Sequence, residues 1–221
     1  MKRKRIKAAV CAAVMAFTLF GSLCPVDHHF MRETSVTASA EAAIWDGTED
    51  TSWYYREHDV IVSENGERIA IFNIRTAEEL AGLAKLVRNG NNMKNTMINL
   101  VSDVTLNDTT NFDNWNEQPP ANNWTAIGAV PIEAPNVNVV MTIQPECRNT
   151  IFAGMFNGNG HTISGMYSLH HNYAGLFART SGIITNVIVK DSYIQCINTQ
   201  KVESGDTALW EACAGGITAI C

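Results

Sequence analysis

Three short segments of this chain share one pattern, an aromatic residue or Cys followed by Ala, Gly and apolar residues. They are FAGMF at 152–156, YAGLF at 173–177 and CAGGI at 213–217. The step from the second segment to the third is close to twice the step from the first to the second. Regular periods of this size are typical of chains that fold into stacked coils. The repeat therefore predicts a stack in which the three segments occupy equivalent positions.

The residues between these segments form short apolar runs with no helical periodicity, such as HTISGMYS, IITNVIVKDSYI and GGITAI. Each run is too short to be stable as an isolated hairpin. Short strands that alternate with glycines favour a solenoid of parallel strands, in which each coil pairs with its neighbour. We therefore predict a mainly β chain built as a parallel β-helix.

Glycine and asparagine mark the expected corners of these coils. Asn157, Gly158, Asn159 and Gly160 precede His161, and both residue types tolerate the positive φ of a sharp turn. We interpret His161 as a corner residue rather than a catalytic base. Further structural turns are expected at glycines of the two later segments, namely Gly175, Gly215 and Gly216.

The segment at 1–40 reads as a secretory signal peptide. A basic stretch, MKRKRIK, precedes an apolar run at 8–23, and ASA at 38–40 fits a cleavage site. An uncleaved membrane anchor is the alternative, but the apolar run is shorter than the roughly 18 residues of a spanning helix. We expect an extracellular protein, secreted or on the cell surface, with no membrane span after cleavage.

Removal of the segment at 1–40 takes away six of the 16 basic residues and two of the 22 acidic ones, which leaves a net charge of about −10. Nucleic acid is then an unsuitable partner, because phosphate binding needs clustered Lys and Arg.

Residues 41–128 are expected to form a lead-in or cap region with one amphipathic helix at 76–89. Thr76 and Glu79 form a capping box, and Gly90 suits the position after the helix. One stripe should dock the helix: Leu80, Leu83, Ala84 and Val87. Before the helix, Asn65-Gly66 predicts a hairpin with a type I′ turn.

Several segments together resemble GLUG-motif repeats of bacterial cell-surface proteins. They are FNGNGHTISGMY, NYAGLFARTSGIITNVIVKDSYI and the final AGGI, and the TAEELAGLAKLV and LVSDVTLND segments resemble the module often found before such repeats. The resemblance covers about residues 45–221 and departs at Ala178 and Ala219, where glycine is usual. It implies a right-handed parallel β-helix on an exported surface protein, and it supplies no catalytic residues. Residues 129–150 look like an insertion, and 151–221 hold the repeats.

A polar loop before this insertion offers two weak candidate sites. Trp115 and Trp124, with Asn116, could stack on and hydrogen-bond a sugar, although packing beneath the loop is the alternative. The acidic side chains could hold Ca²⁺, or could simply favour turns: Asp108, Asp113 and Glu117. No other cofactor is indicated.

Catalytic motifs are sparse. The chain has no H-E-x-x-H and no G-x-S-x-G. A β-helical polysaccharide lyase or glycosidase would need paired carboxylates, yet Asp191 is the single acidic residue from 152 to 200, and Glu203 and Asp206 follow it. Enzyme activity stays open, and the sequence favours a non-catalytic protein.

Four cysteines remain after cleavage: Cys147, Cys196, Cys213 and Cys221. Export permits disulfides, and four cysteines allow three pairings. Buried cysteines can also serve as small apolar side chains.

We therefore predict a stalk, adhesin or interaction surface that binds a host or cell-wall glycan or protein. A carbohydrate-binding module and a carbohydrate-active enzyme are the alternatives. The sequence stops within a repeat, so further C-terminal repeats are expected.

Overall fold

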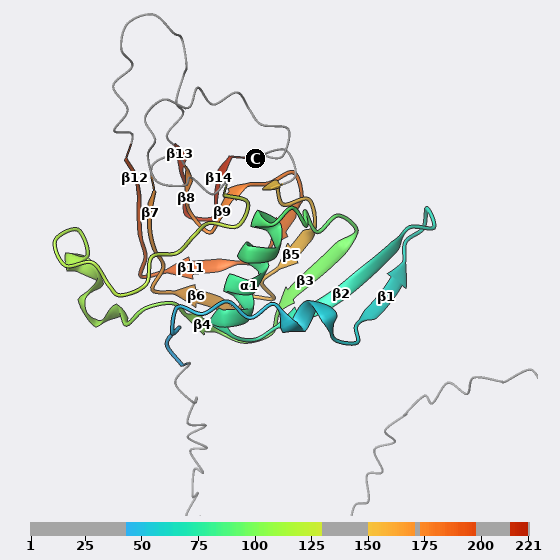
Figure 1. Cartoon of the computed structure of the whole chain (residues 1–221), viewed down its shortest axis with the longest axis horizontal. Helices are drawn as coiled ribbons and strands as arrows, with labels where there is room; N and C mark the ends of the chain where they lie inside the picture. Colours follow the sequence, from blue (N-terminus) through green and yellow to red (C-terminus); the bar gives the residue numbers. More distant parts are fainter. Residues whose placement is uncertain (1–42, 130–149, 171–172, 198–212, 221) are drawn as a thin grey trace, which may run out of the picture. The chain divides into compact units, whose positions relative to one another are not determined.

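The computed structural model describes residues 43–129, 150–170, 173–197 and 213–220. The predicted signal peptide and nearly all of the insertion-like segment lie outside these residues. The described chain is mainly β, with one α-helix and two short 3-10 helices (Figure 1).

The largest sheet has five strands in the order β1-β2-β3-β5-β10. Their bounds are Asp59–Val62, Arg68–Ile74, Thr96–Leu100, Met155–Asn157 and Ile183–Thr185. From β2 onward every pair is parallel, and β1 joins β2 antiparallel. Register aligns one apolar residue from each parallel strand, and these residues are Phe72, Ile98, Phe156 and Ile184.

A second parallel sheet follows in the order β11-β6-β4, and its strands run side by side in Figure 1. Their bounds are Ile188–Lys190, Thr162–Ser164 and Val104–Thr105. Val104, Ile163 and Val189 share one row of this sheet.

Three further parallel pairs complete the strands. β7 (Tyr167–His170) pairs with β12 (Tyr193–Cys196). β8 (Tyr173–Ala174) pairs with β13 (Cys213–Ala214), and β9 (Phe177–Arg179) pairs with β14 (Thr218–Ile220).

The register corrects the predicted repeat. Met155 pairs with Ile183, and Tyr167 pairs with Tyr193, so paired strands are further apart in sequence than the step from FAGMF to YAGLF. FAGMF therefore lies beside the segment at 181–184 and not in the position of YAGLF. YAGLF and CAGGI do align, since Tyr173 pairs with Cys213. The shared Ala-Gly pattern predicts the wrong partner for FAGMF, because strand pairing is decided by the side chains that face the core.

Helix α1 (Ala77–Arg88) lies one residue inside each predicted end, because Thr76 and Asn89 are its caps. Thr76 Oγ1 accepts from the Glu79 N–H at 3.2 Å. Glu79 Oε2 reaches back to the N–H of Arg75, at 2.7 Å, one residue earlier than in a standard capping box. At the other end Gly90 has φ of 95°, and two backbone bonds complete a Schellman motif.

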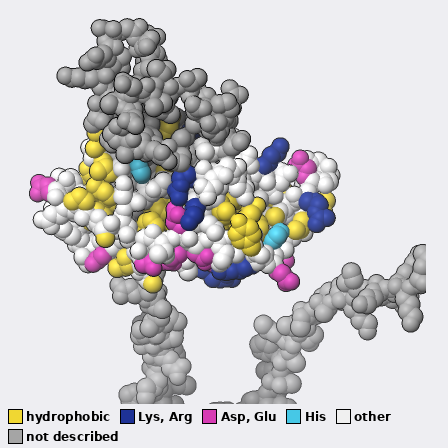
Figure 2. Space-filling model, viewed as in Figure 1, with side chains coloured by type: hydrophobic (Ala, Val, Ile, Leu, Met, Phe, Trp, Pro, Cys, Tyr) yellow, Lys and Arg dark blue, Asp and Glu magenta, His cyan; other side chains and the backbone are white. Residues whose placement is uncertain are grey.

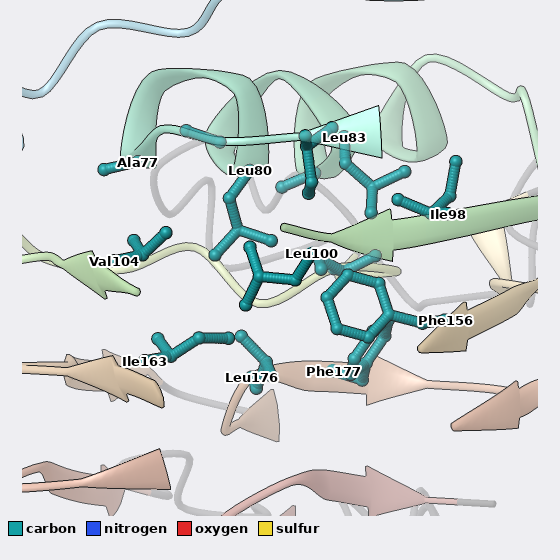
Figure 3. Close-up of a cluster of buried hydrophobic side chains, with 14 of the residues drawn as sticks. Ala77, Leu80, Leu83, Ile98, Leu100, Val104, Phe156, Ile163, Leu176 and Phe177 are labelled. Atoms are coloured by element: carbon teal, nitrogen blue, oxygen red, sulfur yellow. The ribbon is translucent and has the colours of Figure 1, made fainter. Parts of the chain in front are cut away.

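The inner face of α1 packs on the strand core. Figure 3 shows Leu80 and Leu83 pointing toward Leu100 and Ile98, with Phe156 in the next layer. All five side chains are at most 1% exposed. Burial of each large apolar side chain contributes about 1.5–3 kcal/mol, so this packing holds the helix over one end of the core.

The outer face of α1 is covered as well, so docking through a single stripe was too narrow a prediction. A Cβ built on Gly82 would lie 1.9 Å from the carbonyl oxygen of Asp50. Asp50 N–H also donates to Glu78 O at 2.8 Å, and Trp53 Nε1 donates to Glu79 O at 3.0 Å. The segment that contains the 3-10 helix η1 (Ser52–Tyr55) therefore covers the outer face of α1.

The predicted hairpin is present as β1–β2, but its turn differs from type I′. Ser63 N–H donates to Glu67 O, and Gly66 N–H donates to Ser63 O, both at 2.9 Å. Gly66 has φ of 84°, whereas Asn65 is outside the positive-φ region. This is a three-residue loop with glycine in the left-handed position, the next most common hairpin connection.

Candidate interaction surface

In the described part of the chain, the parallel strands end at one edge that carries exposed apolar side chains. We call it the C-terminal edge and define it as residues 183–190 together with Ile217. Ile183 is 57% exposed, Ile188 47% and Ile217 39%. Among the described residues, β10 and β11 are each the last strand of their sheets.

Backbone groups of β10 also face this edge. Ile183 N–H donates to Gly154 O at 3.0 Å, and Gly158 N–H donates to Thr185 O at 2.9 Å. Ile183 and Thr185 therefore face β5. Successive residues of a strand direct their peptide groups to opposite sides, so the N–H and C=O of Ile184 face away from the sheet. Such groups are available to pair with another strand.

The inward side chains of this edge are only partly enclosed. Ile184 and Val189 are half-buried, while their register partners Phe156 and Ile163 are 1% and 0% exposed. A cavity of about 350 Å³ opens beside Ile184. Its lining residues are Thr180, Gly182, Ile184, Thr185, Asn186, Val187, Ile217 and Thr218. Among the described residues, the apolar rows thus end in side chains that are only half-buried.

Strand β1 forms the opposite edge of the five-stranded sheet. Val60, Ile61 and Val62 are 40%, 44% and 67% exposed. A second cavity, of about 420 Å³, lies nearby and has charged walls that include Arg56 and Asp59. On the face drawn in Figure 2 apolar side chains form separate groups with charged residues between them.

The predicted corner at 157–161 is a turn between two sheets. Asn159 and Gly160 have φ of 50° and 77°. Gly158 is needed for a different reason, because a Cβ there would lie 2.4 Å from Asn186 O. Asn157 accepts a hydrogen bond from Asn186 Nδ2 at 3.1 Å, which ties together two neighbouring corners.

His161 lies at this corner in a hydrogen bond with Asp103. The distance from His161 Nδ1 to Asp103 Oδ1 is 3.1 Å, and Thr162 N–H donates to the same oxygen at 2.9 Å. The Thr162 N–H is the main cause of a lowered pKa of Asp103, and the His161 side chain adds to it. Sequence reasoning missed Asp103, which is far from His161 along the chain.

Two of the three glycines predicted as later turns, Gly175 and Gly215, lie close to backbone atoms of other residues. Gly175 has φ of 148°, and a Cβ there would lie 2.3 Å from Gly215 O. A Cβ on Gly215 would lie 2.0 Å from Thr218 O. Gly216 differs, because no heavy atom lies within 4 Å of its built Cβ.

The predicted sugar-binding tryptophans are in the interior, which corrects that interpretation. Trp115 is 2% exposed and packs edge-on against Tyr167. Trp124 is 1% exposed, packs against Trp45, and donates through Nε1 to Leu176 O at 3.3 Å. A buried ring offers no face to a sugar, so both residues support packing. Asn116, which follows Trp115 in the sequence, is exposed.

The predicted calcium ligands are spread over an exposed loop. Asp108 Oδ1 accepts from Thr110 N–H at 3.0 Å and caps the 3-10 helix η2 (Thr109–Asn114). Asp113 and Glu117 are exposed. Within the described ranges no three His, Cys, Asp or Glu side chains are grouped to hold a metal ion.

Of the three carboxylates considered for catalysis, Asp191 lies within the described residues. Asp191 has φ of 48° and follows β11. Glu203 and Asp206, like Cys147 and Cys221, lie outside the described residues.

Comparisons with profiles of known families, with characterised proteins and with solved structures find no match to this chain. No helix in the described part of the chain has the length and apolar character needed to cross a membrane.

Proposed function

We propose that the parallel strands are successive coils of a right-handed β-helix capped by α1. The register supports this proposal, because the three strand pairs β5–β10, β6–β11 and β7–β12 follow one another in the same order along the chain. Like residues also stack between neighbouring strands. Tyr167 and Tyr193 lie face to face, with ring centroids 5.3 Å apart.

We further propose that this is a secreted or cell-surface module of the GLUG-repeat type. The Asn-Gly-Asn-Gly-His corner and the basic, apolar and small-residue order of the segment at 1–40 support that assignment.

Its function, in this proposal, is non-catalytic interaction by strand addition at the C-terminal edge. The occupant is an extended strand of a second polypeptide, aligned parallel to β10 and continuing along β11. The observation that carries the proposal is that the N–H and C=O of Ile184 point away from β5, next to the exposed side chains of Ile183 and Ile188. Main-chain bonds give affinity in this mode of recognition, and pockets for alternate side chains give specificity.

The existing parallel ladder dictates what the added strand should look like. In β5 and β10 one apolar side chain points into the core, and the side chains of the residues before and after it point to the surface. An added strand with the same alternation would place an apolar side chain over Ile184 and extend the apolar row. The 350 Å³ cavity beside Ile184 and Val187 provides space for that side chain.

A fluorescent peptide with the sequence of residues 180–192, TSGIITNVIVKDS, provides a test because it has the alternation of the last strands. We expect saturable binding in fluorescence anisotropy. The variant Ile183→Lys/Ile188→Lys should bind about tenfold more weakly, because two apolar cross-strand pairs are lost.

The matched control is Val60→Lys/Val62→Lys, which places the same charges on the opposite edge and should bind like the wild type. Equal binding by all three proteins, or by a scrambled peptide, would contradict strand addition at this edge.

A further inference from the structure

Cys196 and Cys213 are neighbours in the structure although the segment at 197–212 separates them in sequence. Cys196 ends β12 and Cys213 begins β13, and these two strands contact each other. The backbone N–H of Cys213 lies near enough to the Cys196 thiol to act on its pKa, against the larger effect of burial. Both side chains are half-buried free thiols.

The adjoining strands hold this proximity in place. Cys196 pairs with His170, and Cys213 pairs with Tyr173, three positions further along the chain. Rotation about χ1 of Cys213 moves its sulfur among three staggered positions relative to its own backbone N–H. Because β12 and β13 contact each other, a change of χ1 at Cys213 can turn its sulfur toward Cys196, and a disulfide then needs an S–S distance of about 2.05 Å.

We propose that Cys196 and Cys213 form a disulfide that closes the chain between β12 and β13. The oxidant is a second disulfide, either a small one such as oxidised glutathione or one in a thiol–disulfide oxidoreductase. Cys213 thiolate attacks it and forms a mixed disulfide, with release of one thiol. Cys196 thiolate then attacks the Cys213 sulfur and releases the second thiol. The two cysteines lose two protons and two electrons, and the oxidant becomes two thiols.

The surroundings of Cys196 set how fast the bond forms. Burial raises the pKa of its thiol, and the Cys213 N–H acts in the opposite direction with a smaller effect. A raised pKa lowers the thiolate fraction at neutral pH. Oxidation should therefore be faster at about pH 8.5 than at about pH 7.

The bond stabilises the folded chain by restricting the unfolded one. Closure of a loop of this length removes conformational freedom mainly from the unfolded ensemble. Reduction should then lower the melting temperature by about 5–10 °C. The disulfide does not depend on strand addition at the C-terminal edge.

The test is peptide mapping of the full chain after incubation with oxidised glutathione and alkylation of the remaining thiols. Trypsin cuts after Lys190 and Lys201, so Cys196 is in peptide 191–201 and Cys213 in peptide 202–221. Because the second peptide also holds Cys221, fragment ions between the two cysteines assign the link. We expect a 196–213 link that persists in Cys147→Ser/Cys221→Ser.

Thermal unfolding adds a second readout. Reduction should lower the melting temperature of the wild type and of Cys147→Ser/Cys221→Ser, but not that of Cys196→Ser. Alkylated Cys196 after full oxidation, or a link from Cys196 to Cys147 or Cys221, would overturn the proposal.

Discussion

Phe156 and Ile184 are register partners on adjacent parallel strands, yet Phe156 is 1% exposed and Ile184 is half-buried. Both side chains belong to the row that starts at Phe72 and passes through Ile98. The row is closed at its first end, where Phe72 is 5% exposed and packs against Trp53 and Tyr54. At its other end, Ile184 belongs to the last strand of the sheet among the described residues, and this difference between the two ends is the basis of the proposed function.

Gly158→Ala should destabilise the fold by about 1–3 kcal/mol, because overpacking at a rigid contact has that effect. The added methyl group would lie 2.4 Å from Asn186 O, which is a backbone atom and cannot rotate away. Urea denaturation measures the change in the free energy of unfolding.

The control for that prediction is Gly216→Ala. No heavy atom lies within 4 Å of its built Cβ, and its φ is not positive. The variant should be neutral or slightly stabilising, because alanine restricts the unfolded chain. Equal losses in the two variants would show that the corner contact at Gly158 is not the cause.

Trp124→Ala should cost about 3–5 kcal/mol, as expected for removal of a buried aromatic side chain. The indole contacts Trp45 and donates a hydrogen bond to Leu176 O. The melting temperature and the midpoint of urea unfolding should both decrease. Asn116→Ala, on the exposed side of the same loop, should stay within about 0.5 kcal/mol of the wild type. A folded, fully stable Trp124→Ala would reopen the sugar-stacking interpretation.

Asp103 should give the fold a small dependence on acid pH. Its pKa is lowered in the folded state, first by the Thr162 N–H. The carboxylate therefore stabilises the fold fully above its unfolded pKa, about 3.9, and the contribution is lost as pH falls through the folded value. The effect should be modest because the side chain is 66% exposed.

Asp103→Asn isolates this contribution, since asparagine keeps an acceptor oxygen for Thr162 but does not titrate. The wild type should melt above the variant at about pH 6, and the difference should shrink between about pH 4 and pH 3. A difference that stays constant over this range would assign the effect to packing rather than to charge.

The features that sequence predicted well are local ones. Thr76, Glu79 and Gly90 set the limits of α1, because capping bonds join residues that are close together along the chain. The corner at Asn159 and Gly160 was also readable, because positive φ is a property of individual residue types.

Features that depend on distant partners were missed or misplaced. The pairing of Met155 with Ile183 depends on which face of each strand meets the core, and the repeated Ala-Gly pattern does not encode this. Asp103 and His161 are brought together only by folding. Trp115 and Trp124 lie in a polar loop segment, and their burial results from packing against distant residues such as Tyr167 and Leu176.

The most direct test of the open edge is amide hydrogen exchange at Ile184, measured by NMR at a concentration where the protein is monomeric. The Ile184 N–H should exchange rapidly, whereas the amides of Ile183 and of Ile98 in central β3 should be protected. The 180–192 peptide should then slow exchange at Ile184. Strong protection of Ile184 in the monomer without peptide would show that this edge is already paired, and the account of an open strand edge would be wrong.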